Sequence, residues 1–270
     1  MNVQIIAEIG WNHMGDMSLA KEMISAASDS GAQYVKFQTW SVDNLKKGPW
    51  DSDGRREIYK KAELSRDQHV ELFNYCNQNN ISFLTSVFNY NDVEWIRDIL
   101  SLQTIKIPSH EIYNVELISM VDGLFEQVFI STGAAKWKEI TTITNKIKKS
   151  NLVLFHCVSA YPCPAKNINL PRILELKKLC NNVGYSGHYF GIDDAIASLN
   201  YGVNYIEKHF TIDRNLPGRD NNFAILPDEL ATLVEYCRNH ELMNRVLGVE
   251  MQSVELDTYK YYRGRWSLSK

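Results

Sequence analysis

Short apolar runs that end in polar or ionisable residues recur along the whole chain. The run at Tyr205 and Ile206, for example, ends in Glu207, Lys208 and His209, where a packed core would favour more Val or Ile. Counting such runs gives eight candidate strands, near residues 3–8, 33–38, 81–86, 104–108, 127–132, 152–157, 182–186 and 203–208. The pattern indicates strands that carry chemistry at their carboxyl ends.

Helical periodicity fills most of the gaps between these runs. It predicts helices at 17–30, 66–78, 91–100, 137–149, 171–180, 192–201 and 227–239. Eight strands alternating with helices predict an α/β fold, a (β/α)8 TIM barrel, whose active site lies at the carboxyl ends of the strands. A doubly wound open sheet is the competing architecture, but residues 8–15 lack its G-x-G-x-x-G turn.

Two segments depart from this alternation. Residues 40–63 are charged, turn-rich and longer than an ordinary connection between a strand and a helix, which indicates a lid or a surface excursion. The last residues look like a tail that leaves the barrel. We therefore expect a TIM-barrel domain over 1–250 and a C-terminal tail over 251–270.

Composition narrows the function classes. A chain of 270 residues that is 44% hydrophobic can bury the core of one enzyme-sized domain. Its 29 basic and 32 acidic side chains form no long basic run, which argues against a nucleic-acid footprint. No apolar run is long enough for a membrane span, so we expect a soluble, cytoplasmic protein. Five cysteines without a C-x-x-C pair indicate reduced structural thiols.

Two histidines at neighbouring strand ends are candidate metal ligands. Because strand side chains alternate, His188 shares a face with Ser186, and His209 shares a face with Glu207. Two imidazoles would leave open positions on a divalent metal, as a Lewis acid that polarises a carbonyl requires. Mn²⁺, Zn²⁺, Co²⁺ and Fe²⁺ all fit such ligands. The alternative is that each histidine is a packed, hydrogen-bonded residue.

Charged residues within apolar strands indicate an anionic ligand. Lys36 and Lys106 would be costly to bury unpaired, so each is expected to meet a carboxylate or a bound anion. The Ser131-Thr132-Gly133 run leads into a helix and can hold a phosphate or simply cap that helix. Glu8 and Glu111 are candidates for acid/base work, with a salt bridge to either lysine as the alternative.

Seven ordered motifs between about residues 5 and 238 resemble those of one enzyme family, the sialic acid synthases. They are residues 7–10 with 12–13, 35–39, 106–109, 131–133, 156–162, 184–188 and 207–211. The resemblance implies condensation of phosphoenolpyruvate with an aldose, commonly N-acetylmannosamine or a related acetamido sugar. The products would be a nine-carbon 2-keto-3-deoxy acid and phosphate.

The same resemblance assigns roles to individual residues. It implies that His188 and His209 hold the metal, most often Mn²⁺, with Mg²⁺, Co²⁺ or Zn²⁺ as alternatives. Seven residues match positions that bind phosphoenolpyruvate, and Gln38 is added from the same motif: Lys36, Gln38, Ser86, Lys106, Ser109, Ser131, Ser159 and Ser186. The acid/base and sugar-contacting set is Glu8, Glu111, Tyr161, Glu207 and Asp220, with Glu8 the preferred essential carboxylate.

The sequence departs from the bacterial pattern of this family in a few places. Gly187 stands where many members have Asp, His110 where Gly is common, and Arg219 where Pro is frequent. Typical members continue into an antifreeze-like domain whose arginine reaches the partner subunit's site, whereas this sequence ends at Lys270. We therefore expect an acceptor without an N-acyl group, a separate protein that replaces the domain, or recognition moved to barrel loops. Candidates for that last role are Arg55, Arg56, His110 and Arg219.

The same residues allow other interpretations. An arginine pair at Arg55 and Arg56 would suit an aldose phosphate acceptor, although a solvated charged loop explains it as well. A homodimer is expected from the resemblance. The alternatives to a sialic-acid-like synthase are a related octulosonate or deaminated nonulosonate synthase, and a non-catalytic sugar-binding barrel subunit.

Overall fold

Eight parallel strands close into a barrel in which each strand pairs with its neighbours in sequence and β1 pairs with β8. The structure is a computed structural model that describes residues 3–148 and 152–266. The strands are β1 Gln4–Glu8, β2 Tyr34–Thr39, β3 Ser82–Val87, β4 Thr104–Ile107, β5 Gln127–Ser131, β6 Leu152–His156, β7 Asn182–Gly187 and β8 Tyr205–His209. All eight coincide with predicted strands to within a few residues, so the predicted (β/α)8 barrel is confirmed.

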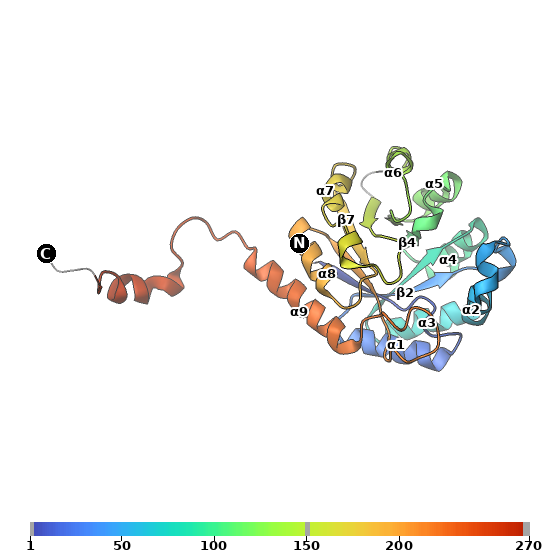
Figure 1. Ribbon diagram of the computed structural model, residues 1–270, viewed down its shortest axis with the longest axis horizontal. Coiled ribbons are helices and arrows are strands. Elements are labelled where there is room, and N and C mark those ends of the chain that lie inside the picture. Colours follow the sequence, from blue (N-terminus) through green and yellow to red (C-terminus); the bar gives the residue numbers. More distant parts are fainter. Residues whose placement is uncertain (1–2, 149–151, 267–270) are drawn as a thin grey trace.

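Helices surround the barrel (Figure 1). They are α1 Met17–Asp29, α2 Arg55–Ala62, α3 Arg66–Gln78, α4 Val93–Leu100, α5 Val115–Leu124, α6 Trp137–Thr144, α7 Arg172–Lys177, α8 Asp193–Ser198 and α9 Pro227–Met243. Seven match predicted helices. The predicted helix at 137–149 is shorter, since α6 ends at Thr144, and residue 149 lies outside the described residues. None of the helices in the described ranges has the length and apolar character that a membrane crossing requires.

Two helices had no counterpart in the prediction. α2 lies inside the segment interpreted as a lid or excursion, and its eight residues include five charged side chains and one buried residue, Ala62. Such a helix carries almost no apolar stripe, so periodicity does not reveal it. α5 buries Leu117, Ile118 and Val121 and is capped by Asn114, whose side chain accepts from the Leu117 N–H. Apolar residues are so frequent in α5 that their spacing does not distinguish a helix from a strand.

Alternation along the strands divides the buried side chains into two sets. Inside the barrel, Ile6, Leu84, Phe129, Val153 and Phe155 form an apolar cluster. Outward-facing residues pack against the helices in the larger core. Above the inner cluster, toward the carboxyl ends of the strands, the inward positions become polar and charged. This change of chemistry along the strands positions the site at that rim.

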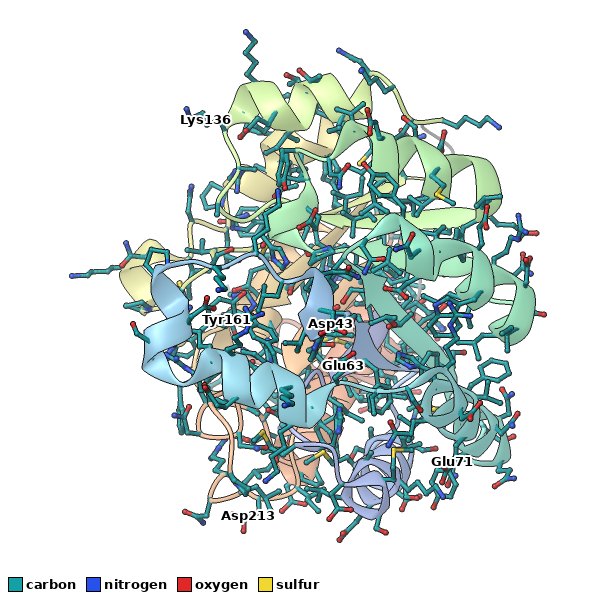
Figure 2. All side chains as sticks on the ribbon, turned by 90° about the vertical axis from the view of Figure 1, so that its right-hand side faces the viewer. Asp43, Glu63, Glu71, Lys136, Tyr161 and Asp213 are labelled. Carbon is teal, nitrogen blue, oxygen red and sulfur yellow. The ribbon has the colours of Figure 1, made fainter. Side chains whose placement is uncertain are left out.

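Segment 41–63 lies over this rim near β1 and β2. The Trp40 indole donates to the Tyr59 carbonyl oxygen at 3.3 Å, and the Trp11 and Tyr59 rings lie 4.9 Å apart. Figure 2 shows α2 crossing in front of the barrel on the side where Tyr161 lies. The segment is therefore folded against the mouth of the barrel.

The chain after α9 runs away from the barrel (Figure 1). Its apolar side chains are largely exposed, with Val249 at 99% and Trp266 at 86%. The predicted division at residue 250 stays a prediction, and residues 267–270 of the predicted tail lie outside the described residues.

Candidate active site

Four buried charges meet inside the barrel near its carboxyl rim. Lys36 Nζ lies 2.7 Å from Glu8 Oε2 and 3.9 Å from Glu207 Oε1, and Lys106 Nζ lies 2.6 Å from Glu207 Oε2. Each of the four residues is at most 5% exposed. We call Glu8, Lys36, Lys106 and Glu207 the charge array.

Strand register brings these residues together. Glu8 on β1 is directly beside Lys36 on β2 and beside His209 on β8. Glu207 is two positions before His209, so both side chains lie on the inner face of β8. Lys106 reaches the array from β4. The expected burial of both lysines beside carboxylates is thus present in the structure.

Burial and mutual attraction shift the ionisation of the array. Burial would raise the pKa of Glu207, but Lys106 and Lys36 outweigh it and hold that pKa below its usual value. Burial raises the pKa of Glu8, opposed by Lys36. Burial also lowers the pKa of Lys106, although Glu207 opposes it. Glu207 is therefore the fixed anion of the array, and Glu8 is the carboxyl group that more readily takes up a proton.

Polar groups surround the array. Gln38 Nε2 donates to Glu8 Oε1 at 2.5 Å, and Ser186 Oγ donates to Glu207 Oε1 at 3.0 Å. Lys106 Nζ also lies 4.3 Å from the centre of the Phe155 ring, a cation–π contact. Ser86 pairs with Lys106 in the β3–β4 register, and its buried Oγ has no hydrogen-bond partner within the described chain. An unsatisfied buried hydroxyl beside Lys106 suits an anionic ligand.

The two histidines predicted as metal ligands are neighbours. The ring centres of His188 and His209 lie 5.5 Å apart, and both residues are buried. Burial lowers the pKa of His188 to about 4 and that of His209 well below its usual value, so both imidazoles are neutral at pH 7. Neutral imidazole is the form that binds metal ions.

The hydrogen bonds of the His188 and His209 ring nitrogens show which atoms are free to bind a metal. His188 Nδ1 donates to the Val158 carbonyl oxygen at 2.7 Å, which leaves Nε2 as its ligand atom. His209 Nδ1 is buried without a hydrogen-bond partner in the described structure. Across residues 3–148 and 152–266, no three His, Cys, Asp or Glu side chains gather as ligands of one ion. The residues fit a metal held by two imidazoles, with its other positions left to water or substrate.

Asp220 and Tyr161 border the histidine pair. Asp220 Oδ2 accepts from Trp11 Nε1 at 2.6 Å and lies 3.5 Å from His209 Nδ1. Burial raises the pKa of Asp220 to about 7, which the Trp11 hydrogen bond opposes. The Tyr161 ring is half exposed, and its centre lies 4.1 Å from that of His188. Both residues are therefore placed to meet a substrate at the histidines.

Small residues gather on the other side of the rim. Ser109 Oγ and Ser159 Oγ are 3.2 Å apart. A Cβ on Gly133 would lie 2.4 Å from Ser159 Oγ and 2.8 Å from Cys157 Sγ. Glycine is therefore needed where the loop after β5 approaches these hydroxyls. Ser131, which ends β5 just before this loop, is buried.

Other candidates lie apart from the array. Glu111 is partly exposed on a 3-10 turn, Ser109–Glu111, where its carboxylate accepts from Asn114 Nδ2 at 3.3 Å. Arg55 Nε and Arg219 Nη1 both contact Asp53 Oδ2, at 2.9 and 3.3 Å. The Arg219–Asp53 contact ties segment 41–63 to the loop before α9.

The remaining two recognition candidates make local contacts. Arg56 contacts Asp51 at 3.5 Å and donates to the Leu45 and Val42 carbonyl oxygens. His110 is exposed beside the Phe88 ring, with 5.0 Å between ring centres.

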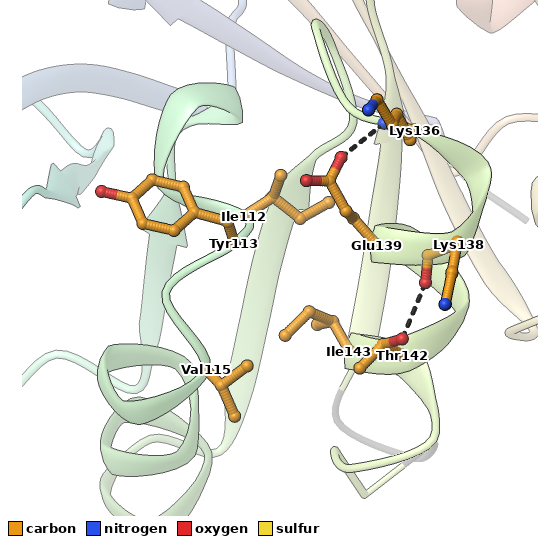
Figure 3. Close-up of a pocket in the computed structure, with 8 residues that line it drawn as sticks. All are labelled: Ile112, Tyr113, Val115, Lys136, Lys138, Glu139, Thr142 and Ile143. Atoms are coloured by element: carbon orange, nitrogen blue, oxygen red, sulfur yellow. Dashed lines mark hydrogen bonds between the residues drawn. The ribbon is translucent and has the colours of Figure 1, made fainter.

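One hollow on the surface is separate from these residues. It has a volume of about 290 Å³ and lies between α5 and α6, where Ile112, Val115 and Ile143 give it an apolar lining (Figure 3). Lys136 and Glu139 stand at its edge. None of the residues predicted to bind or react lines it.

Several residues at the site could not be found from the sequence. Trp11 holds Asp220, and Phe155 contacts Lys106, but neither type of residue signals such a role by itself. Lys208 belongs to one of the family motifs, whereas nothing singled out its buried partner Asp194. Lys208 Nζ lies 3.0 Å from Asp194 Oδ1. A lysine in a buried strand predicts an acidic partner, yet sequence cannot say which one.

Fold and site together define a barrel enzyme that acts on an anionic substrate at the carboxyl ends of its strands. Comparison with known proteins gives the family. Residues 23–247 match the NeuB family, and the chain belongs to it. The predicted family resemblance and the predicted class of enzyme, a synthase, are thereby confirmed.

Relatives and solved structures agree with this assignment. The chain is 36% identical over 251 residues to N,N'-diacetyllegionaminic acid synthase of Campylobacter jejuni, a match that covers 87% of this chain and 75% of that protein. It is 33% identical over 258 residues to N-acetylneuraminate-9-phosphate synthase of Homo sapiens, covering 90% and 71%. The crystal structure of N-acetylneuraminic acid (sialic acid) synthetase from Leptospira borgpetersenii, in complex with citrate, has a TM-score of 0.87 at 31% identity, covering 98% and 93%.

Proposed function

We propose that this protein condenses phosphoenolpyruvate with an acetamido hexose to give a sialic-acid-like 2-keto-3-deoxy sugar acid and inorganic phosphate. The observation that carries the proposal is the charge array beside two neutral imidazoles at one barrel rim. Family membership supports it, because relatives at 36% and 35% identity are named N,N'-diacetyllegionaminic acid synthases. Those names favour a diacetamido hexose as the first acceptor to test.

The proposed reaction forms a carbon–carbon bond and breaks a carbon–oxygen bond. The double bond of phosphoenolpyruvate supplies the electron pair that joins its C3 to the aldehyde carbon of the open-chain sugar. The aldehyde oxygen takes up a proton and becomes a hydroxyl group. Water adds to the positive C2 and loses one proton, which balances the proton taken up by the aldehyde oxygen. The bond between C2 and the phosphate oxygen then breaks, the hydroxyl proton on C2 passes to the departing phosphate, and the keto group is left.

Lys36 and Lys106 are the proposed partners of the phosphoenolpyruvate anions, together with the nearby serine hydroxyl groups. Both ammonium groups already point into the barrel, and a fixed cation stabilises a developing or transferred negative charge without reorganisation. Glu207 holds both lysines and stays ionised. Glu8 and Asp220, whose pKa values are raised, are the proposed groups that exchange protons with water and the sugar.

His188 and His209 are the proposed ligands of a divalent metal, with Mn²⁺ first. Such an ion, when bound, would polarise the aldehyde as a Lewis acid. His188 is oriented for this role through its Nδ1 hydrogen bond, and Tyr161 covers its ring from the solvent side. The Trp11–Asp220 contact holds the carboxylate beside His209.

An aldose phosphate is the second candidate acceptor. It would need free cationic groups at the mouth, whereas Arg55 and Arg219 both contact Asp53. Related octulosonate or deaminated nonulosonate synthesis stays an alternative because it uses the same phosphoenolpyruvate chemistry.

The test is phosphate release from phosphoenolpyruvate with Mn²⁺ across a panel of aldoses, each with an EDTA control. The panel contains a 2,4-diacetamido hexose, N-acetylmannosamine, its 6-phosphate, mannose and arabinose 5-phosphate. We expect release with an acetamido hexose that EDTA abolishes. Release with arabinose 5-phosphate or mannose alone would favour the alternatives. No phosphate release with any aldose of the panel, although phosphoenolpyruvate binds, would contradict the proposal.

A further inference from the structure

A buried ion pair lies on the outer face of the barrel, behind the histidine pair. The Asp194 carboxylate, at the start of α8, contacts Lys208 Nζ on β8 at 3.0 and 3.1 Å. Its Oδ2 also accepts from the Tyr185 hydroxyl group on β7 at 2.8 Å. All three residues are at most 3% exposed. Because strand side chains alternate, Tyr185 and Lys208 face away from Ser186 and Glu207, which point into the barrel.

This pair is connected to His188 through the backbone. Lys208 Nζ donates a further hydrogen bond to the Tyr189 carbonyl oxygen at 2.8 Å. Tyr189 directly follows His188. The His188 carbonyl oxygen in turn accepts from the Cys163 N–H at 2.8 Å, and its Nδ1 donates to Val158. The backbone around His188 is thus fixed at the residue itself and at the next one.

Gly187, immediately before His188, makes room for the pair. A Cβ at this position would lie 2.2 Å from Asp194 Oδ2 and 2.7 Å from the Tyr185 ring. Any other residue would displace the carboxylate from Lys208 and Tyr185. The position of the Asp194 carboxylate therefore depends on glycine at residue 187.

The energetics of a buried ion pair favour a role other than packing. A buried ion pair stabilises a fold little compared with apolar residues of the same volume, because both charges lose their hydration. Such a pair instead fixes the direction of its hydrogen bonds. Lys208 makes one of these outside the pair, to the Tyr189 carbonyl oxygen. From these contacts we propose that Lys208 and Asp194 are positioning residues, which hold the backbone after His188 so that its Nε2 is oriented to bind the divalent ion. The proposal rests on the function proposed above for His188.

Removing the pair should loosen the imidazole of His188 without touching Lys36 or Lys106. We would label the chain with ¹⁵N-histidine and follow exchange of the His188 Nδ1 proton by NMR in metal-free protein, assigning it with His188→Gln. In Lys208→Met and Gly187→Ala we expect this exchange to accelerate by about tenfold or more, since its hydrogen bond to Val158 then opens locally. Ser198→Ala is the matched control, because it removes a buried hydroxyl group from α8 outside this network.

The same variants are then titrated with Mn²⁺ and assayed. We expect affinity for Mn²⁺ to weaken about 10- to 100-fold, as for other groups that orient metal ligands. The kcat for phosphate release should fall, while KM for phosphoenolpyruvate stays within about twofold because the lysines that bind it are intact. A purely structural role would instead lower the melting temperature and leave the exchange and the affinity of the folded protein unchanged.

A double variant guards against loss of folding. Lys208→Met with Asp194→Leu removes both charges at similar volume and should fold, yet it lacks the hydrogen bond to Tyr189. Faster His188 exchange in this variant supports the proposal, and wild-type exchange together with wild-type Mn²⁺ affinity overturns it. If the wild-type protein neither binds Mn²⁺ nor releases phosphate, the proposed function fails, while the exchange rates still decide the positioning role.

Discussion

Lys106 and Glu207 meet at 2.6 Å although their strands, β4 and β8, stand on opposite sides of the closed barrel. The contact therefore spans the interior above the apolar cluster. It joins the two halves of the barrel, and Lys36 joins the same carboxylate from a third strand at 3.9 Å. Ligand binding and stability are both linked to this one carboxylate.

Replacing Lys106 by Met should weaken both phosphoenolpyruvate binding and the fold. We expect KM for phosphoenolpyruvate to rise about 10- to 100-fold, the worth of a hydrogen bond to a charged group. Of its two lysines Glu207 would keep only the more distant Lys36, so the free energy of unfolding should fall by about 3 to 5 kcal/mol. Steady-state kinetics and urea unfolding measure the two effects.

The matched control is Lys21→Met. Lys21 pairs with Glu71 at 2.6 Å on the surface, where an ion pair contributes less than about 1 kcal/mol. An unchanged KM in the Lys106 variant would contradict its role in anion binding.

Glu8→Gln should lower turnover while the fold persists. The amide keeps the size of the carboxyl group but cannot exchange a proton, so kcat should fall by about 10² to 10⁴. Glu111→Gln serves as the comparison, because the Glu111 carboxylate contacts Asn114 rather than the charge array. An equal fall of kcat in the two variants would contradict the larger catalytic role that we assign to Glu8.

Removal of the metal should abolish activity reversibly. After dialysis against EDTA we expect no phosphate release, with recovery on addition of Mn²⁺. His209→Ala should not recover, because the second imidazole is gone. Full activity of that variant after stringent removal of metal would sink the assignment of His209 as a ligand.

Acid should destabilise the protein through the buried histidine of the loop after β1. His13 is fully buried, its Nδ1 accepts from the Gly15 N–H at 3.0 Å, and burial lowers its pKa to about 4. In the unfolded chain the same group has a pKa of about 6.5, so between these values the unfolded state binds more protons. Stability contributed by the neutral imidazole is thus complete above about pH 6.5 and is lost as the pH falls toward 4.

Unfolding in urea at pH 7.5 and pH 5 measures this effect. For His13 alone we expect a loss of about 2 kcal/mol between the two values. The variant His13→Asn should show a correspondingly smaller change with pH. The same dependence in both proteins would show that other groups account for it.

The barrel was predictable because its signal is local. Each strand is a short apolar run, and the positions at which Lys36, Glu207 and His209 interrupt it mark the inner rim. The family resemblance added the serines and Asp220. Partners at long range were not predictable, since nothing local to Lys208 or Trp11 points to Asp194 or Asp220, which lie 14 and 209 positions away.

Helix α2, in segment 41–63 over the mouth of the barrel, was not predicted for a different reason. α2 is mostly charged and buries Ala62 alone, so its apolar stripe is too short to predict a helix. Its place is set by contacts of Trp40 and Tyr59 with the rim and by the contact of Arg219 with Asp53. Such tertiary contacts fix a helix that its own sequence pattern does not predict.

The charge array contains two ammonium groups and two carboxylates, so in formal terms its charges cancel. A phosphoenolpyruvate anion that enters this balanced interior adds negative charge at a place where unbalanced charge is costly. Loading must therefore be electrically compensated, by a proton on Glu8 or by a cation that arrives with the substrate. Uptake of substrate and uptake of positive charge then become one thermodynamic event. If the charge is a proton, the heat of binding varies with the ionisation enthalpy of the buffer, and if it is a metal cation, the heat does not.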